Sequence, residues 1–262
     1  MSEFVKTELI GSVFKITLNR PDKFNSFNST MASQLQAALD TAATDKTIRA
    51  VYLTGEGKAF CAGQDLSDLS ANTSAIADSV ERAVREQYNP IVLKLRELEK
   101  PVVCAVNGVA AGAGASLALA CDVVIAATSV AFVQAFSKIG LVPDCGGTYF
   151  LPRLVGMGKA SALMMLGEKI SATDAEKMGM IYKTVQDDQL FEFAMATAIT
   201  LSELPTAGLG LTKRLLNQSM DNSLAQQLES EAVIQAQAAL TTDFGEGVAA
   251  FLSKRKPVFK GE

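Results

Sequence analysis

The sequence predicts an α/β protein with mostly parallel strands, followed by a helical region. Strand-like and helix-like segments alternate from residue 13 to residue 127, and beyond Ser171 the pattern becomes almost wholly helical. Alternation of this kind implies parallel pairing with crossover helices, because parallel neighbours cannot be joined by a tight turn. The 262 residues, 48% of them apolar, are enough for one large domain with a core of its own.

The first half of the chain carries the clearest periodicity. Residues 13–18 alternate as a half-buried strand does, and Arg20-Pro21-Asp22 ends it. A helix is expected after Asn28 or Ser29 as the cap, because apolar residues recur at helical spacing from Met31 to Ala42. A second strand is expected at residues 48–53.

The middle of the chain continues the alternation. Helical periodicity returns around residues 84–88, and Asn89-Pro90 is typical of an N-cap and first helical position for a helix over residues 91–99. Further elements are then expected in the order strand 102–106, short helix 115–120, strand 123–127 and a Pro/Gly-rich corner over 140–147.

The last third should be helical. Ser171 and Asp174 form a capping pattern, and two amphipathic helices are expected near residues 223–240 and 243–253. Pro205 is the expected boundary. Amphipathic helices at a chain end need an apolar surface to cover, so residues 1–204 are expected to hold the site and residues 205–262 to be an oligomerisation region.

Composition excludes several classes of protein. Histidine is absent, which rules out histidine bases, Ser-His-Asp systems and imidazole-bound zinc. The net charge of −4 argues against nucleic acid as a partner. The four cysteines form no C-x-x-C pair and resemble buried free thiols, which favours a reducing, cytoplasmic location. The uncharged stretch between Lys100 and Asp122 is long enough for a membrane span, but its glycines favour a buried strand, loop and helix.

Two segments could present backbone N–H groups to a ligand. Phe60-Cys61-Ala62-Gly63-Gln64-Asp65 is a loop of small residues, whose ordinary alternative is a strand-to-helix connection with Asp65 as a cap. Residues 107–114 join a buried strand to a helix N-terminus, where unpaired N–H groups bind anions. The third glycine of a dinucleotide fingerprint is replaced by Leu117, which disfavours a nucleotide site.

Asp144 is the candidate for proton chemistry. It stands between Pro143 and the pair Gly146-Gly147, in apolar surroundings that should raise its pKa. The alternative is that Asp144 caps the helix that follows.

These segments, in this order, resemble the crotonase family of enoyl-CoA hydratases and isomerases over nearly the whole chain. The resemblance rests on Leu18-Asn19-Arg20-Pro21, Phe24-Asn25-Ser26, Phe60-x-Ala62-Gly63-x-Asp65, Ala105-Val106-Asn107-Gly108, Ala120-Cys121-Asp122 and Gly140-Leu141-x-Pro143-x-x-Gly146-Gly147. It implies a spiral of ββα units followed by a helical trimerisation region.

The resemblance also implies a set of site residues. The N–H groups of Ala62 and Ala113 would hold a CoA thioester carbonyl, with Gly112 as the fallback because many relatives carry glycine where Ala113 stands. The residues expected to contact CoA or the acyl group are Lys23, Phe24, Gln64, Asp65, Leu66 and Phe136. Candidates for the CoA phosphates are Lys23, Lys58 and the cluster Lys254-Arg255-Lys256, although a basic tail is more often just solvated.

Departures from the family pattern indicate the reaction. Hydratases of the family use two glutamates, and Ser116 and Phe136 occupy the matching positions here. Neither can handle water, so classical hydration is expected to be disabled. Asp144 stands where isomerase and dehalogenase members place their working aspartate. Residues 107–122 and 136–148 are most similar to the members that isomerise ring 1,2-epoxyphenylacetyl-CoA in bacterial phenylacetate degradation, which implies conversion of the epoxide to oxepin-CoA with Asp144 as the single base.

Two other functions stay open at this point. A Δ3,Δ2-enoyl-CoA isomerase of fatty acyl chains would need the same residues, and a noncatalytic acyl-CoA-binding protein would use Asp144 only as a cap. The resemblance implies an acyl-CoA substrate, no metal or redox cofactor, and a homotrimer or hexamer. Neither nucleic acid nor a membrane is expected as a partner.

Overall fold

Two sheets hold the described strands of the protein, and from β3 to β8 the strands alternate between them along the chain. The computed structural model describes residues 3–66 and 73–262. From β3 to β8 each strand of the larger sheet is followed by a short strand of the smaller sheet and, twice, then by a helix. This repeat is the predicted spiral of ββα units.

The larger sheet has six strands, of which only the first pair is antiparallel. In spatial order the strands are β1 (Val5–Ile10), β2 (Val13–Leu18), β3 (Ala50–Gly55), β5 (Val102–Val106), β7 (Val123–Ala127) and β10 (Lys183–Val185). The strands predicted over 13–18, 102–106 and 123–127 are confirmed. The strand predicted over 48–53 begins two residues later, because Ile48 N–H donates to the Asp45 carbonyl and so belongs to the preceding turn.

The smaller sheet consists of four strands of three residues each. In spatial order they are β4 (Ala59–Cys61), β6 (Val109–Ala111), β8 (Ala131–Val133) and β9 (Lys169–Ser171). The β4, β6 and β8 strands are parallel, and β9 is antiparallel to β8. Their ends carry the loops predicted to bind a ligand, so this sheet positions the site.

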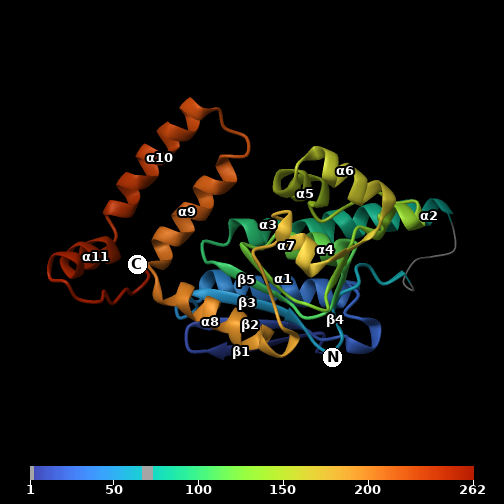
Figure 1. The fold of residues 1–262 in the computed structure, drawn as a ribbon, viewed down its shortest axis with the longest axis horizontal. Helices are drawn as coiled ribbons and strands as arrows, with labels where there is room; N and C mark the ends of the chain where they lie inside the picture. The colour runs from blue at the N-terminus through green and yellow to red at the C-terminus, as the bar shows by residue number, and fades with distance from the viewer. Residues whose placement is uncertain (1–2, 67–72) are drawn as a thin grey trace.

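The helices lie mostly on one side of the larger sheet, and a lobe of helices extends from the body (Figure 1). Their bounds are α1 (Ser29–Thr44), α2 (Thr73–Arg82), the π-helical η3 (Ala83–Tyr88), α3 (Asn89–Glu97), α4 (Ala113–Leu119), α5 (Gly147–Val155), α6 (Met157–Leu166), α7 (Ala172–Lys177), α8 (Leu190–Glu203), α9 (Thr206–Gln218), α10 (Leu224–Ala239) and α11 (Thr242–Leu252), with 3-10 turns η1 (Pro21–Lys23), η4 (Ala135–Ile139) and η5 (Asp187–Gln189).

Two predicted caps, Asn28 and Ser171, are confirmed, one is wrong, and Ser223 is a further cap that was not predicted. Asn28 accepts the Met31 N–H at 2.9 Å, Ser171 caps α7, and Ser223 forms a full capping box on α10. Asn89, predicted to be a cap, has helical backbone angles of −57° and −43° and continues the helix from η3 into α3. Where π-helical turns occur, they are mostly single turns inside a longer helix, as here. Pro90 is tolerated because it lies in the first turn of α3, where its missing N–H costs little.

The helices α9, α10 and α11 form a lobe that stands apart from the two sheets in Figure 1. One face of α9 is tied to the body, because the Lys213 ammonium lies 2.7 Å from Asp122 and Asn217 binds Arg96. The helices predicted at 223–240 and 243–253 are confirmed as α10 and α11. No helix within the described ranges is long and apolar enough to cross a membrane.

Candidate active site

The two loops predicted to present N–H groups are pressed together, backbone against backbone. A Cβ placed on Gly114 would overlap the Cys61 carbonyl oxygen, and one on Gly63 would lie 3.4 Å from the Ala113 nitrogen. Gly63 also has a φ of +92°, which side-chain-bearing residues rarely adopt. Glycine at these two positions therefore brings the loop after β4 against the start of α4.

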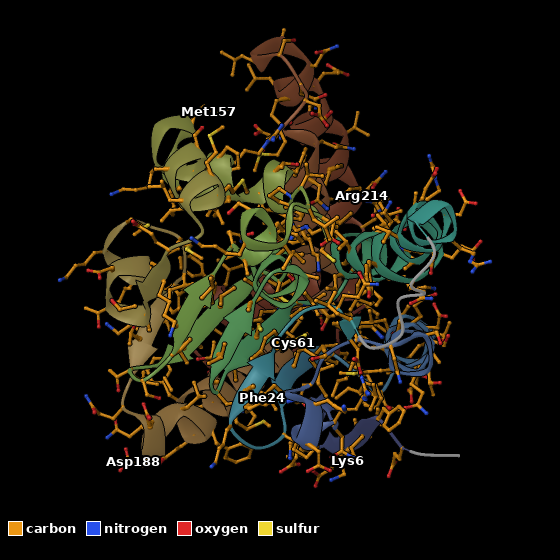
Figure 2. The ribbon with its side chains drawn as sticks, turned by 90° about the vertical axis from the view of Figure 1, so that its right-hand side faces the viewer. Lys6, Phe24, Cys61, Met157, Asp188 and Arg214 are labelled. Atoms are coloured by element: carbon orange, nitrogen blue, oxygen red, sulfur yellow. The ribbon has the colours of Figure 1, made fainter. Side chains whose placement is uncertain are left out.

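Hydrogen bonds within the first loop decide which of its N–H groups are free. The Ala62 N–H donates to the Phe24 carbonyl at 3.0 Å, and the Asp65 N–H donates to the Phe27 carbonyl at 2.9 Å. Figure 2 shows Phe24 beside Cys61, the neighbour of Ala62. For the Gln64 N–H the described residues supply no backbone partner. The expectation that Ala62 donates to a ligand is therefore wrong, and Gln64 offers the free amide of this loop.

In the second loop the backbone N–H of Ala113 is free, as expected. Ala113 is the first residue of α4, where an N–H has no acceptor within its own helix, and none is found elsewhere in the described chain. Its neighbour Gly112, the fallback, donates its N–H to the Val133 carbonyl at 2.8 Å and so is not available. The N–H groups of Gln64 and Ala113 are thus the pair on facing loops.

Among the expected CoA contacts, Asp65 has a different role. Its carboxylate is only 10% exposed and lies 2.9 Å from the Arg20 guanidinium, which also binds the Ser26 carbonyl. Asp65 therefore fastens the loop before α1 to the loop after β4, and its contact with a ligand stays a prediction.

The other expected contacts remain on or near the surface. Lys23, Phe24 and Leu66 are exposed and Gln64 is half-buried. A cavity of about 160 Å³ borders Gln64 and Asp65 from the side of α1 and α2. Lys58 is exposed on a turn that packs against Pro21, close to Lys23.

The basic cluster at 254–256 lies on the C-terminal lobe rather than on these loops. Arg255 pairs with Glu246 at 2.6 Å, and Lys256 pairs with Glu203 at 3.5 Å. Two of the three cations are therefore paired with acidic side chains, one on α11 and one at the end of α8.

Asp144 is a partly buried carboxyl group that caps no helix. The N-cap of α5 is Gly146, without a side-chain cap bond, and Gly147 N–H donates to the Asp144 backbone carbonyl at 2.8 Å. One carboxyl oxygen, Oδ1, is buried and has no hydrogen-bond partner in the described ranges. Burial raises the pKa of Asp144, as predicted, against smaller opposing effects of the Cys145 thiol and its own N–H. The alternative that Asp144 serves only as a cap is therefore wrong.

Ser116 and Phe136 each contact a glycine of the segments that carry Asp144 and the second amide loop. Ser116 is fully buried on α4, so close to Gly147 that a Cβ there would lie 2.6 Å from the Ser116 hydroxyl oxygen. A Cβ on Gly112 would lie 3.7 Å from the ring of Phe136, which is 6% exposed. The structure therefore brings Gln64, Ala113, Ser116, Phe136 and Asp144 to one end of the smaller sheet.

Gln134 was not expected at this site. It follows β8 directly, it is 1% exposed, and neither atom of its side-chain amide has a partner in the described part of the chain. The sequence offered one weak signal for Gln134. It stands two positions after the apolar Phe132, where strand alternation would place both side chains on the same side, but β8 is too short for that pattern to be recognised.

The cysteines are all buried free thiols, as predicted. Burial raises the pKa of Cys61 to about 12 and the pKa of Cys145 well above its ordinary value. Thiols held in the protonated form are poor nucleophiles. Asp144 therefore stays the candidate for proton chemistry at this end of the sheet.

Comparison with known proteins agrees with the geometry. The family model described as enoyl-CoA hydratase/isomerase matches residues 8–262. The 1,2-epoxyphenylacetyl-CoA isomerase of Escherichia coli (strain K12) is 48% identical over 262 residues, covering all of both chains. A Rhodobacter capsulatus protein named "Probable enoyl-CoA hydratase" is 44% identical over 98% of both chains. The crystal structure of an enoyl-CoA hydratase from Polaromonas sp. JS666 has a TM-score of 0.93 at 36% identity, covering 97% of this chain and 99% of the other. The chain belongs to the enoyl-CoA hydratase/isomerase family, the crotonase family whose motifs it carries.

Proposed function

We propose that the protein is an isomerase of CoA thioesters that works through an enolate. The N–H groups of Gln64 and Ala113 hold the thioester carbonyl oxygen, and the negative charge that develops there strengthens both hydrogen bonds. In comparable oxyanion holes one such donor contributes about 2.7–4 kcal/mol. Asp144 removes a proton from the carbon next to the carbonyl and returns it further along the acyl group.

The observation that carries this proposal is the state of Asp144. A carboxyl group with a raised pKa, one buried unpartnered oxygen and no capping bond is suited to accept a proton and return it. Hydration needs a second group to activate water, and Ser116 and Phe136 stand at the two positions where hydratases of the family carry glutamate. A single base favours isomerisation over hydration, although one close relative carries a hydratase name.

The substrate proposed is ring 1,2-epoxyphenylacetyl-CoA, and the product is oxepin-CoA. The E. coli relative of that name is 48% identical from end to end. The bond between the two epoxide carbons first breaks as the ring electrons rearrange, which places the oxygen in a seven-membered ring. In the step assigned to Asp144 the thioester α-carbon then loses a proton, a double bond forms between that carbon and the ring, the adjacent ring double bond is lost, and the next ring carbon gains the proton. Nothing is oxidised or reduced, so the step requires neither a metal nor a redox cofactor. Phe136 supplies an apolar wall beside Gly112 for the ring.

The C-terminal lobe is proposed to join copies of the chain into a homotrimer or a hexamer. Its helices carry large apolar side chains at the surface, among them Leu224, Leu240 and Phe251, which are 77%, 87% and 83% exposed. Such a surface is normally covered in a soluble protein.

Exchange of the α-proton tests the proposal without the unstable epoxide. In heavy water, the wild-type protein should exchange the α-hydrogens of phenylacetyl-CoA, and Asp144→Asn should slow this exchange by about 10²- to 10⁴-fold, because asparagine keeps the size but accepts no proton. NMR of the thioester follows the exchange.

The control for this experiment is Asp188→Asn, an exposed aspartate that Figure 2 places far from Cys61. This variant should exchange at the wild-type rate. Undiminished exchange in Asp144→Asn would remove Asp144 from the mechanism.

A further inference from the structure

Buried side-chain atoms that lack a hydrogen-bond partner are concentrated at the candidate active site. In the described ranges they belong to three residues: the Ser116 hydroxyl, both amide atoms of Gln134, and Oδ1 of Asp144. Buried polar atoms are nearly always paired, so each exception needs a reason. Asp144 has its reason in the proton transfer, but Ser116 and Gln134 have none in the mechanism given so far.

Ser116 lies on the same face of α4 as the free N–H of Ala113. It lies three residues after Ala113 on α4, and residues at that spacing share one face of a helix, about 4.5 Å apart along the axis. Its hydroxyl lies against Gly147, at the turn whose first residue is Asp144. A thioester held at Ala113 therefore extends its acyl carbons toward the side of α4 that carries Ser116.

The residues on either side of Gln134 contact the second amide loop. The carbonyl of its neighbour Val133 accepts the Gly112 N–H, and Phe136, two residues later, packs against Gly112. Gln134 is thus built into the segment that backs the second amide loop, and it is as deeply buried as the core residues around it.

We propose that Ser116 and Gln134 form a polar subsite that hydrogen-bonds an oxygen atom within the ring of the acyl group. The inference rests on the proposed function and names the residues that would select its substrate. The Ser116 O–H and the Gln134 Nε2–H donate to the ring oxygen, which has two lone pairs to accept them. An oxygen-bearing ring satisfies these groups, whereas an aliphatic chain or an all-carbon ring leaves them buried and unpaired.

Binding of two stable thioesters tests the subsite independently of catalysis. Tetrahydropyran-2-ylacetyl-CoA and cyclohexylacetyl-CoA differ only in one ring atom, oxygen in the first and CH₂ in the second. Titration calorimetry with the wild-type protein should show about 3- to 10-fold tighter binding of the oxygen-bearing ring, the value of one ordinary hydrogen bond.

Variants then assign the preference to the two side chains. Ser116→Ala and Gln134→Met should each reduce or abolish the preference, and Ser116→Thr, which keeps the hydroxyl, should retain it. Ser202→Ala is the matched control, because Ser202 is also buried on a helix but its hydroxyl already donates to the Ile199 carbonyl at 2.8 Å. That variant should bind both thioesters as the wild type does.

Thermal unfolding separates recognition from a structural role. Ser116→Ala removes an unpartnered hydroxyl, so its melting temperature should equal or exceed that of the wild type, whereas a structural serine would lower it on replacement. Equal binding of the two thioesters by the wild type, or an unchanged preference in both Ser116→Ala and Gln134→Met, would overturn the subsite. Because neither thioester has to react, these outcomes are distinct from a failure of α-proton exchange, which would count against the isomerase function alone.

Discussion

The pKa of Asp144 distinguishes between the two roles considered for this side chain, a helix cap and a proton acceptor. A carboxylate that caps a helix accepts N–H bonds, which favour the charged form and lower the pKa. Asp144 has the opposite shift, because burial is the largest influence on it and no cap bond compensates. The same burial that makes the charged form costly makes the carboxylate a stronger base once it is ionised.

The pH dependence of α-proton exchange follows from this shift. Because only ionised Asp144 accepts a proton, exchange should fall on acidification at a pH above the range of an ordinary aspartate. The measurement is the exchange rate of wild-type protein across the acidic range. An acidic limb at the pH of an ordinary aspartate would contradict the shift.

Stability provides the matching thermodynamic test. A folded-state pKa raised above the unfolded value contributes stability that is present at low pH and is lost as the pH rises through the folded-state value. The unfolding free energy of the wild type, relative to Asp144→Asn, should therefore decrease as the pH rises through that window.

Residue-level prediction succeeded where the signal was local. The apolar neighbours of Asp144 are adjacent in the chain, so its raised pKa could be predicted from the sequence. The free N–H group of the first loop could not be predicted. The Ala62 N–H is taken up by the Phe24 carbonyl, and the Asp65 N–H is taken up by the Phe27 carbonyl. Those acceptors lie 38 residues earlier in the chain in both cases, and no local pattern encodes which amide they leave free.

At the scale of elements, α4 and α6 begin in closely similar ways. Each follows a glycine with positive φ, +52° at Gly112 and +79° at Gly156, so that Ala113 and Met157 are the first residues of their helices. Proline is favoured at this first position and removes only an N–H that the helix does not use. Proline at either position should therefore remove the backbone N–H of that residue while the helix still forms.

Replacing Ala113 by proline should abolish the second donor of the thioester site. We expect α-proton exchange to fall by about 10²- to 10³-fold, the usual effect of losing one oxyanion donor. Met157→Pro is the control, since Met157 is 70% exposed and Figure 2 places it far from Cys61. Circular dichroism should show the same helix content in both variants, and full exchange activity in Ala113→Pro would show that this amide is not used.

The ion pair between α9 and the body should be a strong structural link. Lys213 is only 7% exposed and binds Asp122, which also binds Arg96 and the Val102 N–H. Removing one partner of a buried pair leaves the other charge uncompensated, so Lys213→Met should destabilise the protein by about 3 kcal/mol in denaturant unfolding.

An exposed pair provides the comparison for Lys213. Lys6 lies 3.6 Å from Glu56 with about half of both side chains in water. Lys6→Met should therefore change the unfolding free energy by less than about 1 kcal/mol. Equal effects of the two substitutions would contradict the structural role of Lys213.

Element length determined which parts of the fold could be predicted. The five- and six-residue strands β2, β5 and β7 have enough residues to show a pattern, and they were found at the predicted positions. The three-residue strands of the smaller sheet span too few residues for any periodicity. They exist because neighbouring strands supply the hydrogen bonds, which is information carried by the whole fold.

At the scale of the whole molecule, the C-terminal lobe is the part of the chain proposed to join copies of it. The helical nature of the segment after Pro205 was predicted from amphipathic spacing and is confirmed, whereas its role in assembly stays a prediction. The apolar side chains exposed on α10 and α11 have no cover within the described chain.

Assembly can be broken at one of these side chains. We expect the wild type to sediment as a trimer or hexamer at micromolar concentration, and Phe251→Glu to shift it toward monomer, because a charge at a buried contact is costly. Leu9→Glu, at an exposed apolar residue of β1, should leave the assembly unchanged. A wild-type monomer would remove the lobe's proposed role.

Arg49 has a consequence for the time course of folding. Its guanidinium donates to the Leu204 carbonyl, the Thr206 hydroxyl and the Phe259 carbonyl, which lie 155 to 210 residues later in the chain. Contacts between residues so far apart in the chain form late, because the entropy cost of closing the long intervening loop must be overcome first. Proteins rich in such contacts fold more slowly. During synthesis on a ribosome, Arg49 would therefore be made long before its partners. The packing of the C-terminal lobe against the sheets would be among the last events of folding.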